Sequence, residues 1–220
     1  MPLEIKNENM MKSTLYFLCL VSFVSGVVPG YGQAENVCLS AQEKLLYDLI
    51  MEYRKSKKLK PIPFSAKLTK VAQTHVRDLE DNFDYELDDN NRIARINPKN
   101  PKTFQITGDC NLHSWSDKGS WSSCCYTADH SQAQCMWDKP KEIAGYDGEG
   151  YEIAYIQSGA ASAKEAIEGW KKSSGHNPLL INSETWSKLT WGAIGIGIYG
   201  KYGVVWFGEK EDKSKIVVCR

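Results

Sequence analysis

The sequence predicts an α+β domain in which helices come first and a β-hairpin comes last. Three segments, which begin after Ser40, near Ser65 and after Ser162, repeat apolar residues at the spacing of an amphipathic helix. The end of the chain alternates apolar with small or polar residues on both sides of a Gly200-Lys201 turn, which is typical of a hairpin. This order of elements predicts one domain with a layered core.

Length and composition are those of an ordinary globular protein. The chain has 220 residues, of which 42% are hydrophobic and 25% are charged. These values exclude collagen-like, disordered and polytopic membrane classes. The 27 basic residues balance the 27 acidic ones. Because proteins that bind phosphate backbones usually carry a basic surplus, we expect no nucleic-acid partner.

Residues 1–34 are expected to be a signal peptide. Residues 15–28 form an uncharged apolar run that is shorter than the roughly 20 residues needed to span a bilayer. Small residues follow it, and cleavage after Ala34 is expected. Translation could start at Met10 or Met11 instead, and a short uncleaved anchor is the alternative to cleavage. We therefore expect an exported, extracellular protein with no stable membrane span after cleavage.

The cysteines predict a disulfide framework. Cleavage removes Cys19 and leaves an even number, which suits an oxidising compartment. The candidates are Cys38, Cys110, Cys124, Cys125, Cys135 and Cys219. Adjacent Cys124 and Cys125 are expected to have different partners, and Cys38 with Cys219 could join the two ends of the domain. Spacing leaves the remaining connectivity open.

The first expected helix follows a capping box formed by Ser40 and Glu43. Its apolar residues recur at helical spacing: Leu45, Leu46, Leu49, Ile50 and Tyr53. The helix is expected to end in the basic run at residues 54–60, whose lysines are interpreted as solvated and favoured by the helix dipole. A surface for heparin or acidic lipid is the alternative interpretation of this run.

The second expected helix carries an apolar stripe made of Leu68, Val71, Ala72, Val76 and Leu79. His75 falls on the same stripe and is interpreted as a packed, hydrogen-bonded core residue. Acidic residues crowd positions 78–89 without the glycine and closing glutamate of a helix-loop-helix calcium site, so we expect a solvated helix end and turn there. Residues 84–160 are expected to form disulfide-braced loops with short strands.

The third expected helix begins at a second capping box, Ser162 and Glu165, and runs through Trp170. Gly175 is expected to end it. In the hairpin, Ile194, Ile196 and Ile198 alternate with small or polar residues, and residues 204–207 form the returning strand.

Two motifs are rejected. Residues 195–200 match the dinucleotide pattern GxGxxG, but they lie inside a strand-like run and no helix follows them. Cys124, Cys125, His130 and Cys135 have part of a zinc-knuckle spacing. Adjacent cysteines cannot easily supply two thiolates to one ion, so disulfides are the stronger interpretation.

A resemblance to a known family rests on several short segments taken in order. They are residues 109–114 (DCNLHS), 150–154 (GYEIA), 170–173 (WKKS), 175–176 (GH) and 204–207 (VVWF). In this order the sequence resembles the CAP superfamily of cysteine-rich secretory, antigen 5 and pathogenesis-related 1 proteins. The resemblance covers residues 40–209 and leaves 210–220 as a C-terminal tail. It implies a disulfide-braced three-layer α-β-α sandwich of the CAP type.

The resemblance also implies a cleft lined by two histidines and two acids, able to hold a divalent metal such as zinc. His113 and His176 match the two histidines. Glu152 best matches the first acid, with Glu149 in reserve because Tyr151 stands where the family has glutamate. Ser173 stands where the second acid is expected, which argues against a simple hydrolytic scheme because a metal-bound water needs a base.

The leading interpretation is a secreted, non-enzymatic binding module. The resemblance implies a cleft offered to an extracellular protein, a lipid or a sterol. Three tryptophans could line such a surface or fill small cores between the disulfides: Trp115, Trp121 and Trp137. The rival is an extracellular hydrolase, either metal-assisted or with Ser173 as nucleophile beside His176 and Glu152. A third interpretation is a structural interaction unit whose cleft is vestigial.

Overall fold

The computed structural model describes residues 37–87, 93–99 and 110–220. The expected signal peptide lies outside these ranges, as do Asp88, Asp89 and Asp109. The described helices are α1 (Ala41–Ser56), α2 (Ala66–Asn82), α3 (Ala133–Ala144), α4 (Ala163–Lys172), the short α5 (Asn177–Leu180) and a 3-10 turn (Glu184–Trp186). None of the helices in these ranges is long and apolar enough to cross a bilayer.

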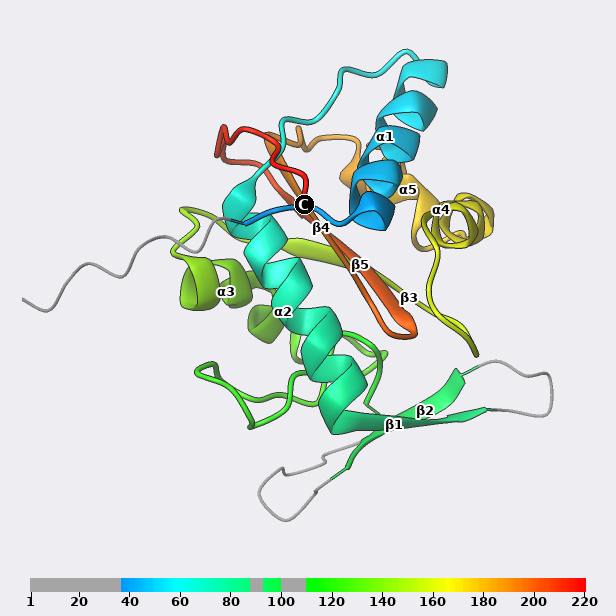
Figure 1. Ribbon diagram of the computed structural model, residues 1–220, viewed down its shortest axis with the longest axis vertical. Helices are drawn as coiled ribbons and strands as arrows, with labels where there is room; N and C mark the ends of the chain where they lie inside the picture. Colours follow the sequence, from blue (N-terminus) through cyan, green and yellow to red (C-terminus); the bar gives the residue numbers. More distant parts are fainter. Residues whose placement is uncertain (1–36, 88–92, 100–109) are drawn as a thin grey trace, which may run out of the picture. The chain divides into compact units, whose positions relative to one another are not determined.

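The central element is an antiparallel sheet with the strand order β3-β5-β4. Its strands are β3 (Tyr151–Ile156), β4 (Ala193–Tyr199) and β5 (Tyr202–Gly208). The β4–β5 hairpin turns at Gly200, whose φ of 54° is left-handed, which confirms the expected hairpin and turn. A separate two-stranded ribbon pairs β1 (Phe83–Leu87) with β2 (Ile93–Pro98) beyond the end of α2 (Figure 1).

Helices cover both faces of the central sheet, so the fold has three layers. Along β5, Val204 and Trp206 pack in the core that contains α2 and α3, whereas Val205 and Phe207 pack in the core that contains α1 and α4. This alternation is the period of two expected for a strand buried on both faces. Figure 1 shows α2 and α3 on one side of the hairpin and α1 and α4 on the other. The expected α-β-α sandwich is confirmed.

The expected capping box at the start of α1 is present. The Ser40 amide donates to Glu43 Oε2 at 2.7 Å, and the Glu43 amide donates to Ser40 Oγ at 3.2 Å. The lysines that follow α1 are exposed as expected, but Arg54 is buried. It donates to the Leu180 carbonyl at 2.7 Å and to Asn182 Oδ1 at 2.8 Å. Burial lowers its pKa to about 10, and Arg54 links α1 to the segment after α5.

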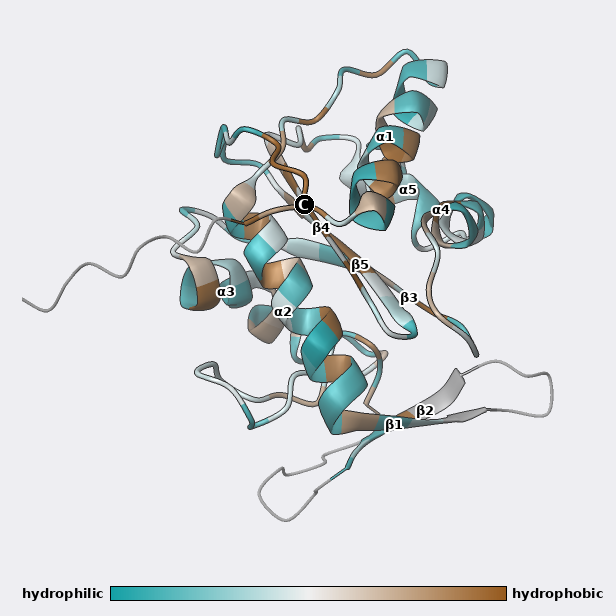
Figure 2. Ribbon diagram, in the orientation of Figure 1, coloured by the Kyte–Doolittle hydropathy of each residue, from teal (hydrophilic) through white to brown (hydrophobic). Residues whose placement is uncertain are grey.

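α2 packs directly on the backbone of β4. A Cβ atom at Gly195 would collide with the backbone of Leu68 and Thr69, and one at Gly197 would collide with the backbone of Ala72. The glycines of the rejected GxGxxG pattern therefore allow a helix to approach a strand closely. Figure 2 shows hydrophobic residues alternating with hydrophilic ones along α2, as expected for a helix with one buried stripe.

The acidic segment at the end of α2 differs from the expectation. Asp78 is only 3% exposed, and its Oδ2 accepts from the Ser116 amide at 2.8 Å. Phe83–Leu87 form β1 rather than a solvated turn. The expectation of solvation was wrong for Asp78 because its partner lies 38 residues away in sequence.

Two further differences concern helices. The segment expected to form loops and short strands also contains α3. This helix was not expected because Pro140 lies in its interior, and proline disfavours a helix interior. Ser162 is the N-cap of α4, as expected, and its Oγ accepts from the Glu165 amide at 3.3 Å. The Glu165 carboxylate accepts from the Ser162 hydroxyl at 2.7 Å rather than from the Ser162 amide, so only half of the second capping box forms. α4 ends at Lys172, before the expected Gly175, and Ser173 is its C-cap.

Three disulfides brace the domain. Cys38 pairs with Cys219, which confirms the expected link between the two ends. The adjacent cysteines have different partners, as expected, since Cys110 pairs with Cys125 and Cys124 with Cys135. The C-terminal segment returns to the domain, where Asp212 Oδ2 accepts from the hydroxyl of Ser65 at the start of α2 at 2.5 Å.

Candidate functional site: a histidine–glutamate cluster beneath an aromatic cleft

Glu152 lies at the centre of the site. It is the second residue of β3 and pairs with Trp206 of β5, in the core on the α2 side. Its side chain is fully buried. Each carboxylate oxygen meets an imidazole: His75 Nδ1 lies 2.5 Å from Oε1, and His113 Nδ1 lies 2.7 Å from Oε2. We call His75, His113 and Glu152 the imidazole cluster.

His75 is held on both ring nitrogens. Nδ1 meets the Glu152 carboxylate, and Nε2 lies 2.9 Å from the Ser114 carbonyl oxygen. Both partners only accept hydrogen bonds, so both ring nitrogens must donate and His75 is an imidazolium. Burial alone would lower the pKa of His75, but the adjacent Glu152 carboxylate outweighs burial and raises it. The ring also stacks on Trp115 at a centroid distance of 4.0 Å.

The charge of Glu152 follows the same balance. Burial acts to raise the pKa of this carboxyl, but the charge of His75 and hydrogen bonds from His113 and His75 outweigh burial and lower the pKa. The cluster therefore contains a buried ion pair, whose ions stay charged because each is hydrogen-bonded.

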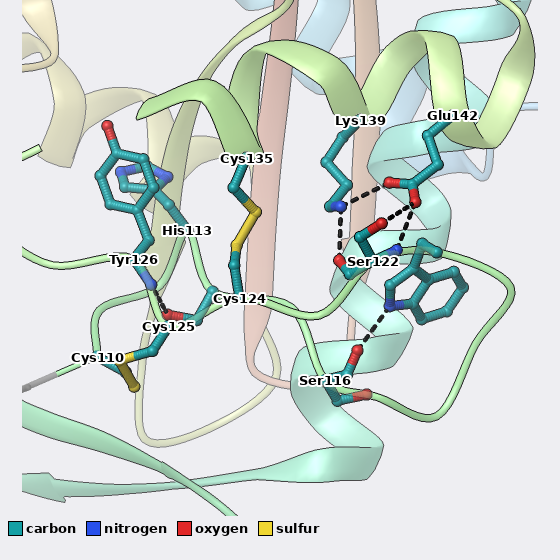
Figure 3. Close-up of a disulfide and its surroundings, with 12 residues drawn as sticks. Cys110, His113, Ser116, Ser122, Cys124, Cys125, Tyr126, Cys135, Lys139 and Glu142 are labelled. Carbon is teal, nitrogen blue, oxygen red and sulfur yellow. Dashed lines mark hydrogen bonds and ion pairs between the residues drawn. A yellow bond between two sulfur atoms is a disulfide. The ribbon is translucent and has the colours of Figure 1, made fainter. Parts of the chain in front are cut away.

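His113 is positioned by the disulfide-braced loop. The Cys110–Cys125 disulfide holds two segments together, and the Asn111 amide donates to the Tyr126 carbonyl at 2.8 Å beside it. The Tyr126 ring packs edge-on against His113 at a centroid distance of 5.3 Å, and Figure 3 shows the two rings together above the disulfide. The cysteines thus fix the direction of the imidazole.

His176 reaches the site from the other side. It lies in the short connection after α4 and is the N-cap residue of α5. Burial, followed by the charge of the neighbouring His113, lowers the pKa of His176 to about 4. His176 is therefore uncharged at neutral pH.

These groups open into a cleft of about 540 Å³. Most of its walls are apolar or aromatic. One wall comes from α3 and the disulfide loop and includes Tyr126, Met136 and Trp137. The other includes Tyr151, Leu179 and Trp186, and the rings of Tyr151 and Trp186 meet edge-on at 5.3 Å. We call this space the aromatic cleft; its volume is within the range of small-molecule sites.

The structure brings three of the predicted site residues to one cleft. His113, Glu152 and His176 all line it. The reserve candidates do not: Glu149 is exposed and accepts from the Tyr151 hydroxyl, and Ser173 Oγ accepts from the His176 amide at 3.3 Å. Of the three tryptophans considered, only Trp137 lines the cleft. Trp115 is fully buried, and the Trp121 ring packs against the Trp115 ring.

Several members of the site are not predicted from the sequence. His75 is a packed, hydrogen-bonded core residue, as interpreted, but its partner is the central carboxylate of the site. A histidine on a buried stripe was the available signal, because a buried imidazole needs a partner. The cleft aromatics gave no such signal: Tyr126, Tyr151 and Trp186.

The described residues do not form a ready-made set of metal ligands. Among residues 37–87, 93–99 and 110–220, no three His, Cys, Asp or Glu side chains are grouped to hold a metal ion. Both Glu152 oxygens accept from imidazole, and Ser173 stands in place of the second acid. Glu152 therefore has no free oxygen to offer zinc, whereas His113 Nε2 and the His176 ring have no bonded partner among the described residues. Zinc binding is a prediction from the resemblance, and titration can test it.

Comparison with known proteins identifies the family. The model of the cysteine-rich secretory protein family, CAP, matches residues 47–209, which is more than half of the chain. The chain belongs to the CAP family. No curated protein sequence matches it.

Solved structures of CAP and related bacterial proteins are similar to this CAP domain. A cysteine-rich secretory protein from Staphylococcus aureus subsp. aureus Mu50 has 15% identity and a TM-score of 0.44 over 77% of this chain and 38% of its own. An extracellular SCP-domain protein from Bacillus anthracis str. Ames has 18% identity and a TM-score of 0.46 over 77% and 40%.

An outer surface protein from Borrelia burgdorferi has 18% identity and a TM-score of 0.43 over 76% of this chain and 92% of its own. This chain spans less than half the length of the Staphylococcus and Bacillus proteins.

Proposed function

We propose that this CAP protein is exported and acts as a non-enzymatic binding module that holds an apolar small molecule, such as a lipid or sterol, in the aromatic cleft. The observation that carries the proposal is the cleft itself, about 540 Å³ with mostly apolar and aromatic walls and a few polar groups at its base. Ligand sites usually combine an apolar cavity with a few convergent polar groups.

The electrostatics of the cleft support an uncharged or weakly polar ligand. The buried imidazole cluster pairs one imidazolium with one carboxylate, and His176 is neutral because its pKa is about 4. A fully charged ligand would lose its hydration in this cavity without a fixed opposite charge at the surface of the cleft. An extracellular protein could be a further partner, either by delivering the ligand or by receiving it.

Export is supported by three disulfides and by membership of a family of secretory proteins. Disulfides persist mainly in oxidising compartments outside the cytosol. The apolar run at residues 15–28 supplies the expected signal for export.

The serine hydrolase alternative has little support from the geometry. A nucleophilic serine needs a histidine ring nitrogen within hydrogen-bond distance. Ser173 Oγ instead accepts from the backbone amide of His176, at the end of α4. The pairing of His113 with Glu152 resembles a base with its orienting acid, but no hydroxyl or thiol among the described residues bonds to the His113 ring.

The proposal can be tested with Nile red, an uncharged apolar dye that fluoresces when it leaves water. We expect saturable binding of about one dye per protein. Ala133→Trp, on the cleft wall at the start of α3, should fill the cavity and weaken binding at least about tenfold, because lost apolar burial costs about 25 cal/mol per Å².

Gln134→Trp is the matched control. It adds the same ring to the neighbouring, exposed position of α3, outside the cleft. Its affinity for Nile red should equal that of the wild type. Absence of saturable binding, or equal weakening by both substitutions, would contradict the proposed binding site.

A further inference from the structure

We propose that the cleft selects ligands that carry a hydroxyl group, which donates a hydrogen bond to His113 Nε2 and accepts one from the His176 ring. This inference rests on the proposed function and deepens it by naming the polar group that the ligand presents. It predicts that an aliphatic alcohol binds better than a carboxylate or an ether of the same length.

The hydrogen bonds of the imidazole cluster fix the position of each proton. His75 donates from both ring nitrogens, to Glu152 and to the Ser114 carbonyl. Glu152 is therefore a carboxylate with one oxygen committed to His75. Its other oxygen, Oε2, accepts from His113 Nδ1 at 2.7 Å. The proton of His113 is thereby placed on Nδ1.

Charge balance disfavours a second imidazolium in the imidazole cluster. One carboxylate neutralises one imidazolium, which is His75, and a second imidazolium would leave a net positive charge beneath an apolar cleft. A neutral imidazole with its proton on Nδ1 carries a lone pair on Nε2. Nε2 of His113 is therefore a hydrogen-bond acceptor.

This acceptor is the contact between the cluster and the cleft. The side chains of His75 and Glu152 are fully buried, whereas 18% of the His113 side chain is exposed. His113 lines the cleft, and its Nδ1 edge is turned to Glu152. Among the described residues Nε2 has no hydrogen-bond partner, so this nitrogen is available to a ligand.

His176 supplies the complementary group. Its ring lines the same cleft as His113 and makes no hydrogen bond to a described residue. A neutral imidazole has one N–H donor and one acceptor. The pair of histidines thus offers an acceptor and a donor above one apolar cavity.

A hydroxyl group matches this pair because it both donates and accepts. An ether oxygen only accepts, so it leaves the His113 acceptor unsatisfied. A carboxylate also only accepts, and it brings a negative charge towards Glu152 and a lone pair towards His113. A protonated amine only donates and cannot satisfy the His176 N–H.

The test uses ligands that differ only in the polar group. Displacement of Nile red at about pH 8 should be measured with 1-decanol, its ether isomer 1-methoxynonane, and decanoate. Since a net hydrogen bond changes the equilibrium constant by about 3- to 10-fold, 1-decanol should bind about 3- to 10-fold more tightly than the ether. Decanoate should bind more weakly than 1-decanol.

Substitutions assign the selectivity to one ring. His113→Phe should bind 1-decanol and 1-methoxynonane within about twofold of each other, because the acceptor is lost and the apolar wall is kept. His130→Phe is the matched control, since His130 lines the same cleft but its Nδ1 is bonded to the Tyr126 hydroxyl at 3.1 Å. It should keep the preference of the wild type.

The outcomes separate the two proposals. If neither the dye nor any of the three ligands binds, the proposed function fails. If the dye binds but 1-methoxynonane or decanoate equals 1-decanol on the wild-type protein, the hydroxyl inference is wrong while the binding function stands. Loss of the preference in His130→Phe, with the preference kept in His113→Phe, would also overturn it.

Discussion

The two faces of the central sheet are built from different chemistry. The core between the sheet and the α1–α4 layer consists mainly of hydrocarbon and aromatic side chains, such as Ile50, Trp170, Ile194 and Phe207. The buried polar residues of α1 are Glu43 and Arg54. The core on the α2–α3 side also buries several polar groups: His75, Asp78, Ser114, Ser116, Lys139 and Glu152. The residues named on both faces are buried, so the difference between them lies in chemistry rather than in depth.

Burying polar groups costs free energy unless each finds a partner. On the α2–α3 side the partners are present: Asp78 accepts from Ser116, and Lys139 donates to Glu142. The exceptions in the described part of the chain are the indole nitrogens of Trp115 and Trp206, beside the imidazole cluster. Polar groups kept in a core at this cost mark the face that carries the imidazole cluster, whereas the α1–α4 face supplies apolar and aromatic residues, including Leu179 and Trp186 of the cleft wall.

Removing one partner of the buried ion pair should have the largest effect. His75→Phe keeps a ring that can stack on Trp115 but removes the imidazolium that neutralises Glu152 and leaves His113 as the only imidazole bonded to this buried carboxylate. Breaking a buried pair in this way should lower the free energy of unfolding by about 3–5 kcal/mol. Ile167→Val, in the apolar core of the other face, should cost only about 0.5–1.5 kcal/mol.

Urea unfolding with the disulfides intact measures both variants. The double variant His75→Phe with Glu152→Gln should recover more than half of the loss, since it removes the unpaired charge. A change below about 1 kcal/mol for His75→Phe would mean that the pair contributes little, and the contrast between the faces would disappear.

The second prediction concerns how closely the helices approach the two faces. Gly195→Ala places a methyl group against the backbone of Leu68 and Thr69 in α2, which should lower the free energy of unfolding by up to about 3 kcal/mol. Gly203→Ala is the matched control on β5, because its Cβ would lie 3.8 Å from Ile198 and 4.0 Å from Ala166 of α4.

The control should cost less than about 1 kcal/mol, since 3.8–4.0 Å is ordinary packing distance. Thermal unfolding of both variants gives the comparison. Equal losses at the two positions would show that α2 shifts to admit the methyl group and that direct helix–backbone packing does not set this face apart.

The third prediction concerns the loss of stability at acid pH. The pKa of His176 is lowered from 6.5 to about 4 in the folded protein. Between these values the unfolded chain binds a proton that the folded protein does not, so stability falls as pH falls. From about pH 7 to about pH 5 we expect His176 to account for a loss of about 1–2 kcal/mol, after allowance for its partial exposure.

His176→Asn should remove this part of the pH dependence, as measured by urea unfolding at each pH. His75, whose pKa is raised, contributes stability below its unfolded pKa that is lost as pH rises through its folded pKa. That contribution has the opposite sign and cancels in the difference between the two proteins. Parallel pH profiles would show that His176 is solvated rather than buried in the cleft.

The smallest expected effect is that of zinc. Because both Glu152 oxygens accept from imidazole and Ser173 replaces an acid, we expect calorimetric titration with zinc to give the same heat for the wild type and for His113→Ala. A one-to-one heat in the wild type that His113→Ala abolishes would show that the cluster rearranges around a metal, as the family resemblance implies.

Local patterns predicted the elements well and the buried charges poorly. The capping residues Ser40 and Ser65, the helical stripes and the Gly200 turn act within a few residues, so sequence spacing is enough to find them. Arg54 and Asp78 were interpreted from their charged neighbours, yet each is buried by partners in distant segments. Charge alone cannot reveal such partners.

The candidate site, too, depends on partners that are distant in sequence and that local patterns do not reveal. His113, Glu152 and His176 were selected by resemblance to a family, because the separations between them carry little local information. His75 has a partner 77 residues away, and the Tyr151–Trp186 wall joins a strand to a turn. Neither pairing has a periodic or motif signal.

The sequence by itself determined the α+β class, the order of the helices and the hairpin, and the number of cysteines available for bracing, because propensity, periodicity and capping are local. Only the tertiary structure decided which carboxylate lies between two imidazoles and which His113 nitrogen faces the cleft. It also decided why β4 needs glycine where α2 packs on it. Those properties depend on the approach of α2 and a disulfide-braced loop to the same sheet, and contacts of that kind are set by packing in three dimensions.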